Sequence, residues 1–162
     1  MIMATIIATK TVTVNAAFLQ EIKDVNRGLW GLFDTVEQFC SRPISIHGAS
    51  KKFVELLNEL RDQLALHFAL EEAYGYFDDP AHVEPWISDR VDSIRGEHRY
   101  LYVAMCELVE HAESLYSEGN WASLATKMPA KFGSYYQQFK EHEWKEQELI
   151  LQAYMDDIGV GG

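Results

Sequence analysis

Five titratable side chains interrupt the otherwise apolar helical faces of this sequence. They are His67, Glu71, His98, His142 and Glu146. Such groups are costly in a protein core unless they are paired, hydrogen-bonded or bound to a metal. Imidazole nitrogens and carboxylate oxygens together form a mixed donor set that suits iron, zinc or manganese. The residue types therefore predict a buried metal centre.

Two of the histidines share one spacing to a glutamate. His67 precedes Glu71 by four residues, and His142 precedes Glu146 by four residues. On a helix this spacing stacks both side chains on one face with an axial offset of about 6 Å, so each pair can reach one metal cluster. Two metal ions about 3.5 to 4 Å apart share carboxylates readily. These ligands do not saturate two ions, and positions stay open for oxygen, peroxide or solvent.

A structural alternative exists for each of these features. One His-x-x-x-Glu pair stabilises a helix without any ligand, and His98 alone reads as a hydrogen-bonded core histidine. Two pairs at one level, met by a third imidazole, favour the metal site. Three glutamates beside the apolar faces are candidates for hydrogen bonds that orient an imidazole, although acidic helix faces are usually only solvated. They are Glu72, Glu97 and Glu143.

The elements that must position these residues are helices. Apolar residues recur with alternating spacings of four and three along four segments, which is typical of helices with one buried face. We expect the first helix to begin at Asn15 and to end before Pro43. The second should begin near Ser50 and end around the helix-breaking segment at 76–80. The third runs from about Ser88 to Gly119, and the fourth runs from Met128, with Pro129 in its first turn and a helical lead-in at 120–127.

Four helices of this length predict an all-α, antiparallel up-down-up-down four-helix bundle. In that arrangement a common level is late in the second and fourth helices and early in the first and third. His67, His142 and His98 obey this rule, and the matching level of the first helix lies between Ile22 and Leu29. We expect an extended or frayed arm at 1–14, the bundle at 15–155 and a flexible tail at 156–162.

Composition narrows the function classes. The chain has 162 residues, of which 48% are apolar, which suits one domain with one core. Its net charge of −11 argues against nucleic-acid and membrane-surface partners. We find no secretory signal and no membrane span in the sequence, and we expect a cytoplasmic protein. Cys40 and Cys106 are expected to be small buried thiols.

The segments that carry the five residues resemble the hemerythrin-like, or HHE cation-binding, domain family. The matching segments are LHFALEEAYGYF, GEHRYLYVAM and FKEHEWKEQELI, and the resemblance covers about residues 15–155. It implies a non-haem di-iron centre with an oxo or hydroxo bridge, used for oxygen binding, oxygen or iron sensing and related redox roles. The donor types themselves also suit zinc or manganese. We expect a small diatomic or peroxide ligand, and a sensing role would need a separate redox or signalling partner.

The sequence departs from the family pattern at two places. The family usually has a histidine early in the first helix, where Asn26 stands here, and oxygen carriers have a second histidine on the third helix, where Ile94 and Tyr102 flank His98. The missing imidazoles argue against reversible oxygen carriage. They favour a carboxylate-richer site, a changed metal or a weakened site. The candidates for a replacement oxygen ligand are Glu21, Asp24 and Glu72.

Three hypotheses follow for the function. The first is a metal-binding protein that binds or senses oxygen, nitric oxide, peroxide or iron. The second is a di-iron enzyme with peroxidase or oxidase activity. The third is a bundle with a degenerate or single-metal site, in which the polar residues form a hydrogen-bonded core network.

Overall fold

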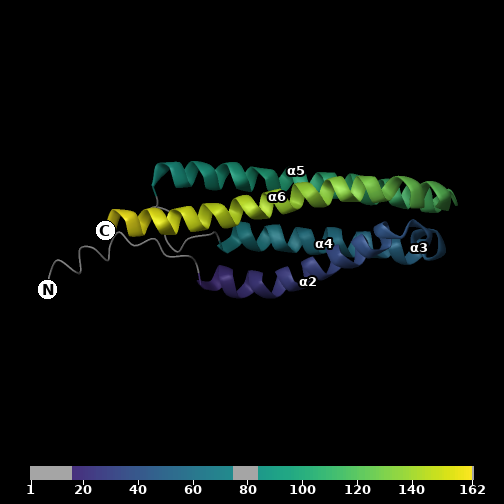
Figure 1. Ribbon diagram of the computed structural model, residues 1–162, viewed down its shortest axis with the longest axis horizontal. Helices are drawn as coiled ribbons and strands as arrows, with labels where there is room; N and C mark the ends of the chain where they lie inside the picture. Colours follow the sequence, from purple (N-terminus) through teal and green to yellow (C-terminus); the bar gives the residue numbers. More distant parts are fainter. Residues whose placement is uncertain (1–15, 75–83, 162) are drawn as a thin grey trace.

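The computed structural model describes residues 16–74 and 84–161, which form five helices and no strand. They are α2 (Ala16–Ser41), α3 (Pro43–Gly48), α4 (Ser50–Tyr74), α5 (Pro85–Ser117) and α6 (Trp121–Gly161). The four long helices lie side by side, and the short α3 lies at one end (Figure 1). This is the expected all-α, antiparallel up-down-up-down bundle. No helix in the described ranges is long and apolar enough to cross a bilayer.

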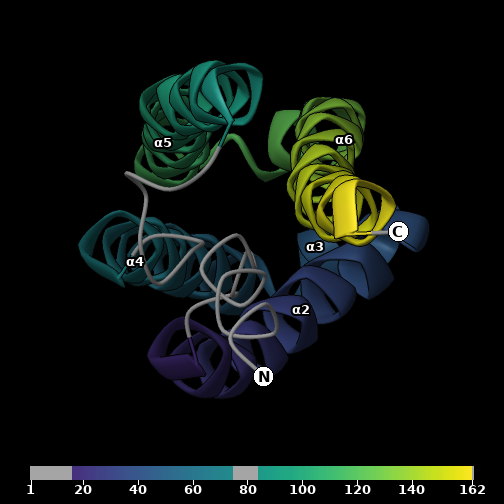
Figure 2. The same ribbon diagram turned by 90° about the vertical axis from the view of Figure 1, so that its left-hand side faces the viewer.

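The long helices surround two separate apolar clusters. Neighbouring pairs pack as a bundle requires, with α2 against α4 and α6 and with α5 against α4 and α6 (Figure 2). The larger cluster contains aromatic and aliphatic side chains such as Phe33, Leu57, Met105 and Phe139. The smaller cluster is formed by Ile87, Ile94, Leu149 and Ala153 of α5 and α6.

The turn between α5 and α6 is defined by two residues. Gly119 has a φ of 71°, a backbone conformation that glycine adopts without steric cost. Its N–H donates to Tyr116 O and the N–H of Asn120 donates to Leu115 O, which is the Schellman pattern at a helix end. The Asn120 Oδ1 then accepts from the N–H of Ser123 and caps α6. The predicted helix end at Gly119 is confirmed.

The structure differs from the expected helix boundaries at several points. The short α3 was not expected; Pro43 lies in its first turn and Ile46 is fully buried. The helix α5 begins at Pro85, before Ser88, because proline suits the first helical position.

The expectation of a lead-in followed by a helix that starts at Met128 was wrong. The helix α6 runs unbroken from Trp121 with Pro129 inside it. Proline removes one backbone hydrogen bond there, but Met128 and Phe132 on either side are buried in the core and keep the segment in place. The backbone of α6 also remains helical through Gly161, without a break at the expected tail. The predicted arm at 1–14 lies outside the described residues.

Candidate metal centre

The five residues predicted from the sequence lie together inside the bundle. Each is at most 5% exposed. His67 and Glu71 come from α4, His98 comes from α5, and His142 and Glu146 come from α6. They are flanked along α5 and α6 by the smaller apolar cluster on one side and the larger one on the other. The helical level expected from the sequence is therefore the level at which these side chains meet.

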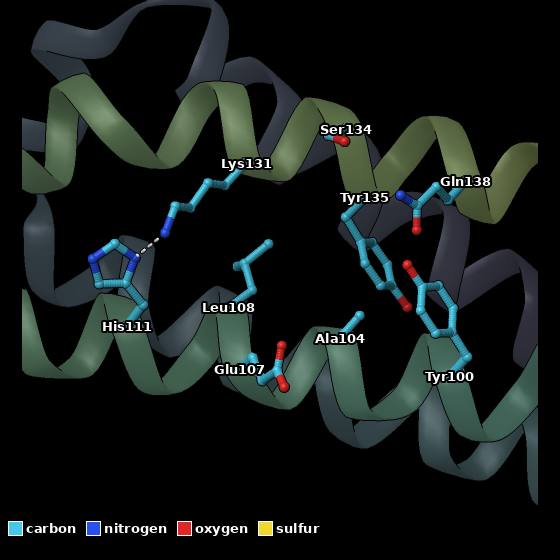
Figure 3. A pocket seen from close by; sticks show the side chains of 9 residues that line it. All are labelled: Tyr100, Ala104, Glu107, Leu108, His111, Lys131, Ser134, Tyr135 and Gln138. Carbon is cyan, nitrogen blue, oxygen red and sulfur yellow. Dashed lines mark hydrogen bonds between the residues drawn. The ribbon is translucent and has the colours of Figure 1, made fainter.

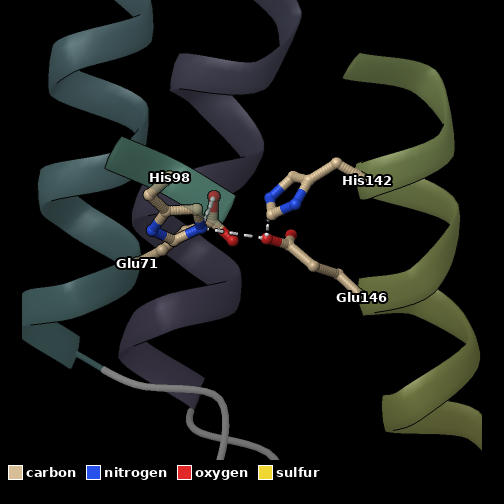
Figure 4. Close-up of side chains that lie close together, drawn as sticks. All are labelled: Glu71, His98, His142 and Glu146. Atoms are coloured by element: carbon tan, nitrogen blue, oxygen red, sulfur yellow. Dashed lines mark hydrogen bonds and ion pairs between the residues drawn. The ribbon is translucent and has the colours of Figure 1, made fainter. Parts of the chain in front are cut away.

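The cluster-facing atoms are the Nε2 atoms of the imidazoles and the carboxylate oxygens. Within the two i,i+4 pairs, the Nε2 of His67 is 2.7 Å from Glu71 Oε1 and the Nε2 of His142 is 2.7 Å from Glu146 Oε1. Between helices, the Nε2 of His98 is 3.3 Å from Glu146 Oε1 and 3.8 Å from Glu71 Oε1. Figure 4 shows Glu71, His98, His142 and Glu146 pointing toward one another.

Two glutamates orient imidazoles from outside the cluster. Glu72 Oε1 lies 3.4 Å from the Nδ1 of His98, and Glu97 Oε1 lies 3.0 Å from the Nδ1 of His142. Lys145 in turn donates to Glu97 Oε2 at 2.9 Å. A carboxylate on one ring nitrogen fixes the ring and leaves the other nitrogen facing the cluster, as in histidine ligands of metal sites.

Glu143 does not take the orienting role for which the sequence made it a candidate. Its side chain is buried, and its Oε1 lies 2.9 Å from the Nε2 of His67, the same nitrogen that Glu71 contacts. It therefore lies within the cluster. One signal pointed to this position: Glu143 precedes Glu146 by three residues, which places the two about 60° apart around the helix.

The donor atoms form two overlapping groups of four. One group is Glu71, His98, His142 and Glu146, and the other is His67, Glu71, Glu143 and Glu146; in each, the donor atoms lie within 4.8 Å of one another. Ligands about 2.1 Å from one ion lie at most about 4.2 Å apart. Small side-chain rotations would close either group around an ion. The set of buried imidazoles and carboxylates thus fits the metals that the sequence predicted.

Protons occupy the cluster in the absence of a cation. Burial alone would lower the pKa of His67, but the hydrogen bonds to Glu143 and Glu71 outweigh it and raise this pKa to about 10. Burial would also lower the pKa of His142, but the hydrogen bond to Glu146 outweighs burial, and the pKa of His142 is raised. Burial raises the pKa of Glu71 to about 9, against the hydrogen bond from His67. A bound metal would displace protons from these donor atoms.

Glu146 is held in its ionised form. Burial raises its pKa, but hydrogen bonds from His142 and His98 outweigh burial and hold the pKa well below the usual range. The cluster therefore keeps an ionised carboxylate that belongs to both groups of donors.

The first long helix presents Asn26 rather than an imidazole. The ring of Trp30 packs 5.3 Å from that of Phe139, which lies 6.1 Å from the ring of His67. Asn26 is one turn before Trp30 on a helix antiparallel to α6, which places it near the level of His142. Its Oδ1 is buried and meets no hydrogen-bond partner among the described residues.

Other residues singled out from the sequence do not join the cluster. The Tyr135 hydroxyl donates to Leu101 O at 3.0 Å, and Tyr102 is 37% exposed. The side chains of Glu21 and Asp24 lie outside the described part of the chain. Burial raises the pKa of Cys40 to about 12, as expected for an inert thiol.

A surface hollow between α5 and α6 is separate from this cluster. Tyr100, His111, Lys131 and Gln138 are among the residues that line it (Figure 3). Lys131 Nζ and His111 Nδ1 are 2.7 Å apart there. None of the cluster residues lines this hollow, so the candidate metal centre is the closed cluster.

Comparison with known proteins agrees with this donor set. The sequence model of the hemerythrin HHE cation-binding domain matches residues 17–154. No curated protein and no solved structure matches the chain.

Proposed function

Because this chain belongs to the hemerythrin HHE cation-binding family, we propose that it holds a non-haem di-iron centre and binds or senses oxygen, nitric oxide, peroxide or iron. One observation carries the proposal. Two buried groups of four donors share Glu71 and Glu146, and carboxylates shared between neighbouring ions are typical of dinuclear sites.

The residues that would hold the metal come from three helices. They are His67, Glu71, His98, His142 and Glu146. Iron bound there would supply one-electron redox chemistry and open positions for a small ligand. Zinc or manganese would be accepted by the same donors.

The protein around the cluster restricts what can reach it. The Phe68 ring stacks on His98 with 4.4 Å between centroids, and Phe139 packs against Phe68 and His67. These rings and the two apolar clusters exclude bulk water and large substrates. This packing supports a diatomic molecule or a peroxide as the ligand.

The position of Glu143 favours a second candidate, an enzyme. A third buried carboxylate makes the donor set richer in oxygen than a nitrogen-rich carrier site, and hard oxygen donors stabilise the higher oxidation state of iron. Peroxidase or oxidase activity with an external reductant would follow from such a site.

The two candidates differ in their response to ligand. Protein loaded with Fe²⁺ under anaerobic conditions is exposed in turn to oxygen, nitric oxide and hydrogen peroxide, and its absorption spectrum is followed. A binding or sensing protein shows a saturable spectral change and no sustained consumption of reductant. Continuous consumption of peroxide or oxygen with reductant supports the enzyme. No spectral change with any of the three contradicts both.

A further inference from the structure

The ion-pair geometry sets Glu143 apart from the other glutamates that flank the predicted ligands. Glu72 and Glu97 contact the outer Nδ1 of an imidazole, and their side chains are 56% and 31% exposed. Glu143 contacts the cluster-facing Nε2 of His67, and the residue is only 7% exposed. A carboxylate that contacts the imidazole nitrogen facing a metal site is close enough to that site to act as a ligand.

We propose that Glu143 is a sixth metal ligand that replaces the imidazole missing from α2 and makes the two halves of the centre unequal. The inference rests on the proposed dinuclear site. One half is His98 and His142, the other is His67 and Glu143, and Glu71 and Glu146 belong to both.

The charge balance of the cluster supports a third carboxylate. Two divalent ions bring four positive charges into a buried site, and uncompensated buried charge is strongly disfavoured. Glu71 and Glu146 alone would leave an excess of two positive charges, whereas Glu143 reduces the excess to one. Asn26 supplies no charge, whereas the Glu143 carboxylate already lies 2.9 Å from the cluster-facing Nε2 of His67.

The unequal donor sets predict unequal metal preferences. The half with His98 and His142 offers two imidazoles of its own, which suit borderline ions such as Zn²⁺ and Fe²⁺. The half with His67 and Glu143 offers one imidazole and one carboxylate of its own, which suits harder ions such as Mn²⁺ and Fe³⁺. The two ions should therefore bind in two resolved steps, and a manganese and a zinc ion should be able to occupy one chain together.

The test compares Glu143→Gln with Glu141→Gln, a control on the exposed face of the same helix. Metal-free protein is titrated with Mn²⁺; bound metal is measured by elemental analysis after desalting, and spin coupling between ions by electron paramagnetic resonance. Circular dichroism of the metal-free proteins checks that both variants fold. The amide in Glu143→Gln keeps the size of the side chain and removes its charge.

We expect the wild-type protein and Glu141→Gln to bind two Mn²⁺ ions that are spin-coupled. Glu143→Gln should retain one ion with the signal of isolated Mn²⁺, and the Kd of the second should rise more than about 100-fold, beyond the effect of losing an orienting partner. Two coupled ions with unchanged Kd in Glu143→Gln would overturn this inference and leave the dinuclear site intact. Fewer than two ions in the wild-type protein would overturn both.

Discussion

The orientation of the His67 ring depends on contacts inside the cluster more than the orientation of the His98 and His142 rings does. Its Nδ1 is buried and meets no hydrogen-bond partner in the described part of the chain, whereas the Nδ1 atoms of His98 and His142 each contact a glutamate. Its ring is therefore held on the polar side only by contacts at Nε2, from Glu71 and Glu143. This nitrogen is also the one that would bind a metal.

Replacing His67 with alanine should remove metal and weaken the fold together. The variant loses the Nε2 of His67, a donor atom that alanine cannot replace. A metal that binds only the folded protein stabilises it by mass action, so the loss of metal also lowers stability. Metal content should fall by at least half, and the melting temperature should fall with it. Elemental analysis and thermal denaturation measure both, with His47→Ala, an exposed histidine on α3, as control. Unchanged stoichiometry in His67→Ala would remove His67 from the site.

Substitution of Asn26 can test the site by a gain in metal affinity. Its position one turn before Trp30 predicts that Asn26→His adds an imidazole near the level of His142. The variant should bind the weaker of the two ions at least about 10-fold more tightly, because an imidazole is a far better ligand than an amide. Isothermal titration with Mn²⁺ measures the change. An unaltered Kd would show that position 26 does not face the cluster.

The sequence identified the buried histidines and two of the glutamates because they replace apolar residues in a regular pattern. Glu143 was placed outside the cluster because it is one residue away from that pattern, at the edge of the buried face. Only the actual rotation of α6 shows which side of the helix its carboxylate reaches. Its spacing of three residues to Glu146 was the one sequence feature that set it apart from Glu72 and Glu97, which also stand beside a predicted ligand.

Among the helices, the last turn of α4, which carries Glu71, is held by a side chain of α5. Arg95 of α5 donates to the carbonyl oxygens of Glu71 and Glu72, at 3.3 Å and 2.6 Å, in the last turn of α4. The last carbonyls of an α-helix in general lack intrahelical donors, and a cation there also suits the helix dipole. This contact holds α4 against α5 beside the donor atom of Glu71.

The turn between α5 and α6 gives a prediction with an internal control. Gly119→Ala places a side chain at positive φ and should lower the free energy of unfolding by about 1 kcal/mol. Gly133→Ala, at an exposed position inside α6 with open space around the new methyl group, should raise it by about 1 kcal/mol. Urea denaturation of both variants measures the two signs. Equal signs would contradict the helix boundaries described for this turn.

Several helix boundaries followed from local signals, whereas the start of α6 is an exception with a tertiary cause. The glycine at 119 predicted a helix end that the structure contains. Pro129 suggested a start because local rules place proline in a first turn. Burial of the residues around it keeps a continuous helix instead, and the local rule for proline does not take this burial into account.

At the scale of the whole molecule, the cluster joins three helices at a polar layer next to apolar packing. Side chains from α4, α5 and α6 meet there. The pKa values of His67, Glu71 and His142 are raised, which favours their protonated forms, and a bound cation would replace these protons. A metal would tie these helices together through bonds that the unfolded chain cannot form. Stability of the bundle should therefore be linked to metal concentration.

Removal of metal should lower the melting temperature without abolishing the fold, because the larger apolar cluster does not include the donors. At a free metal concentration of about 100 times Kd, the expected stabilisation is about 2.7 kcal/mol. Thermal denaturation with and without a chelator measures it, and His67→Ala should show a smaller difference. Identical melting curves for wild-type protein with and without chelator would argue that metal does not bind the folded state.

The most direct test of the central claim is elemental analysis of the purified protein together with its absorption spectrum, in air and after anaerobic reduction. A dinuclear iron centre should give about two iron ions per chain and charge-transfer bands near the ultraviolet edge that disappear on reduction. A protein that holds one metal ion or none, and that takes up no second ion when loaded anaerobically with Fe²⁺, would contradict the dinuclear centre.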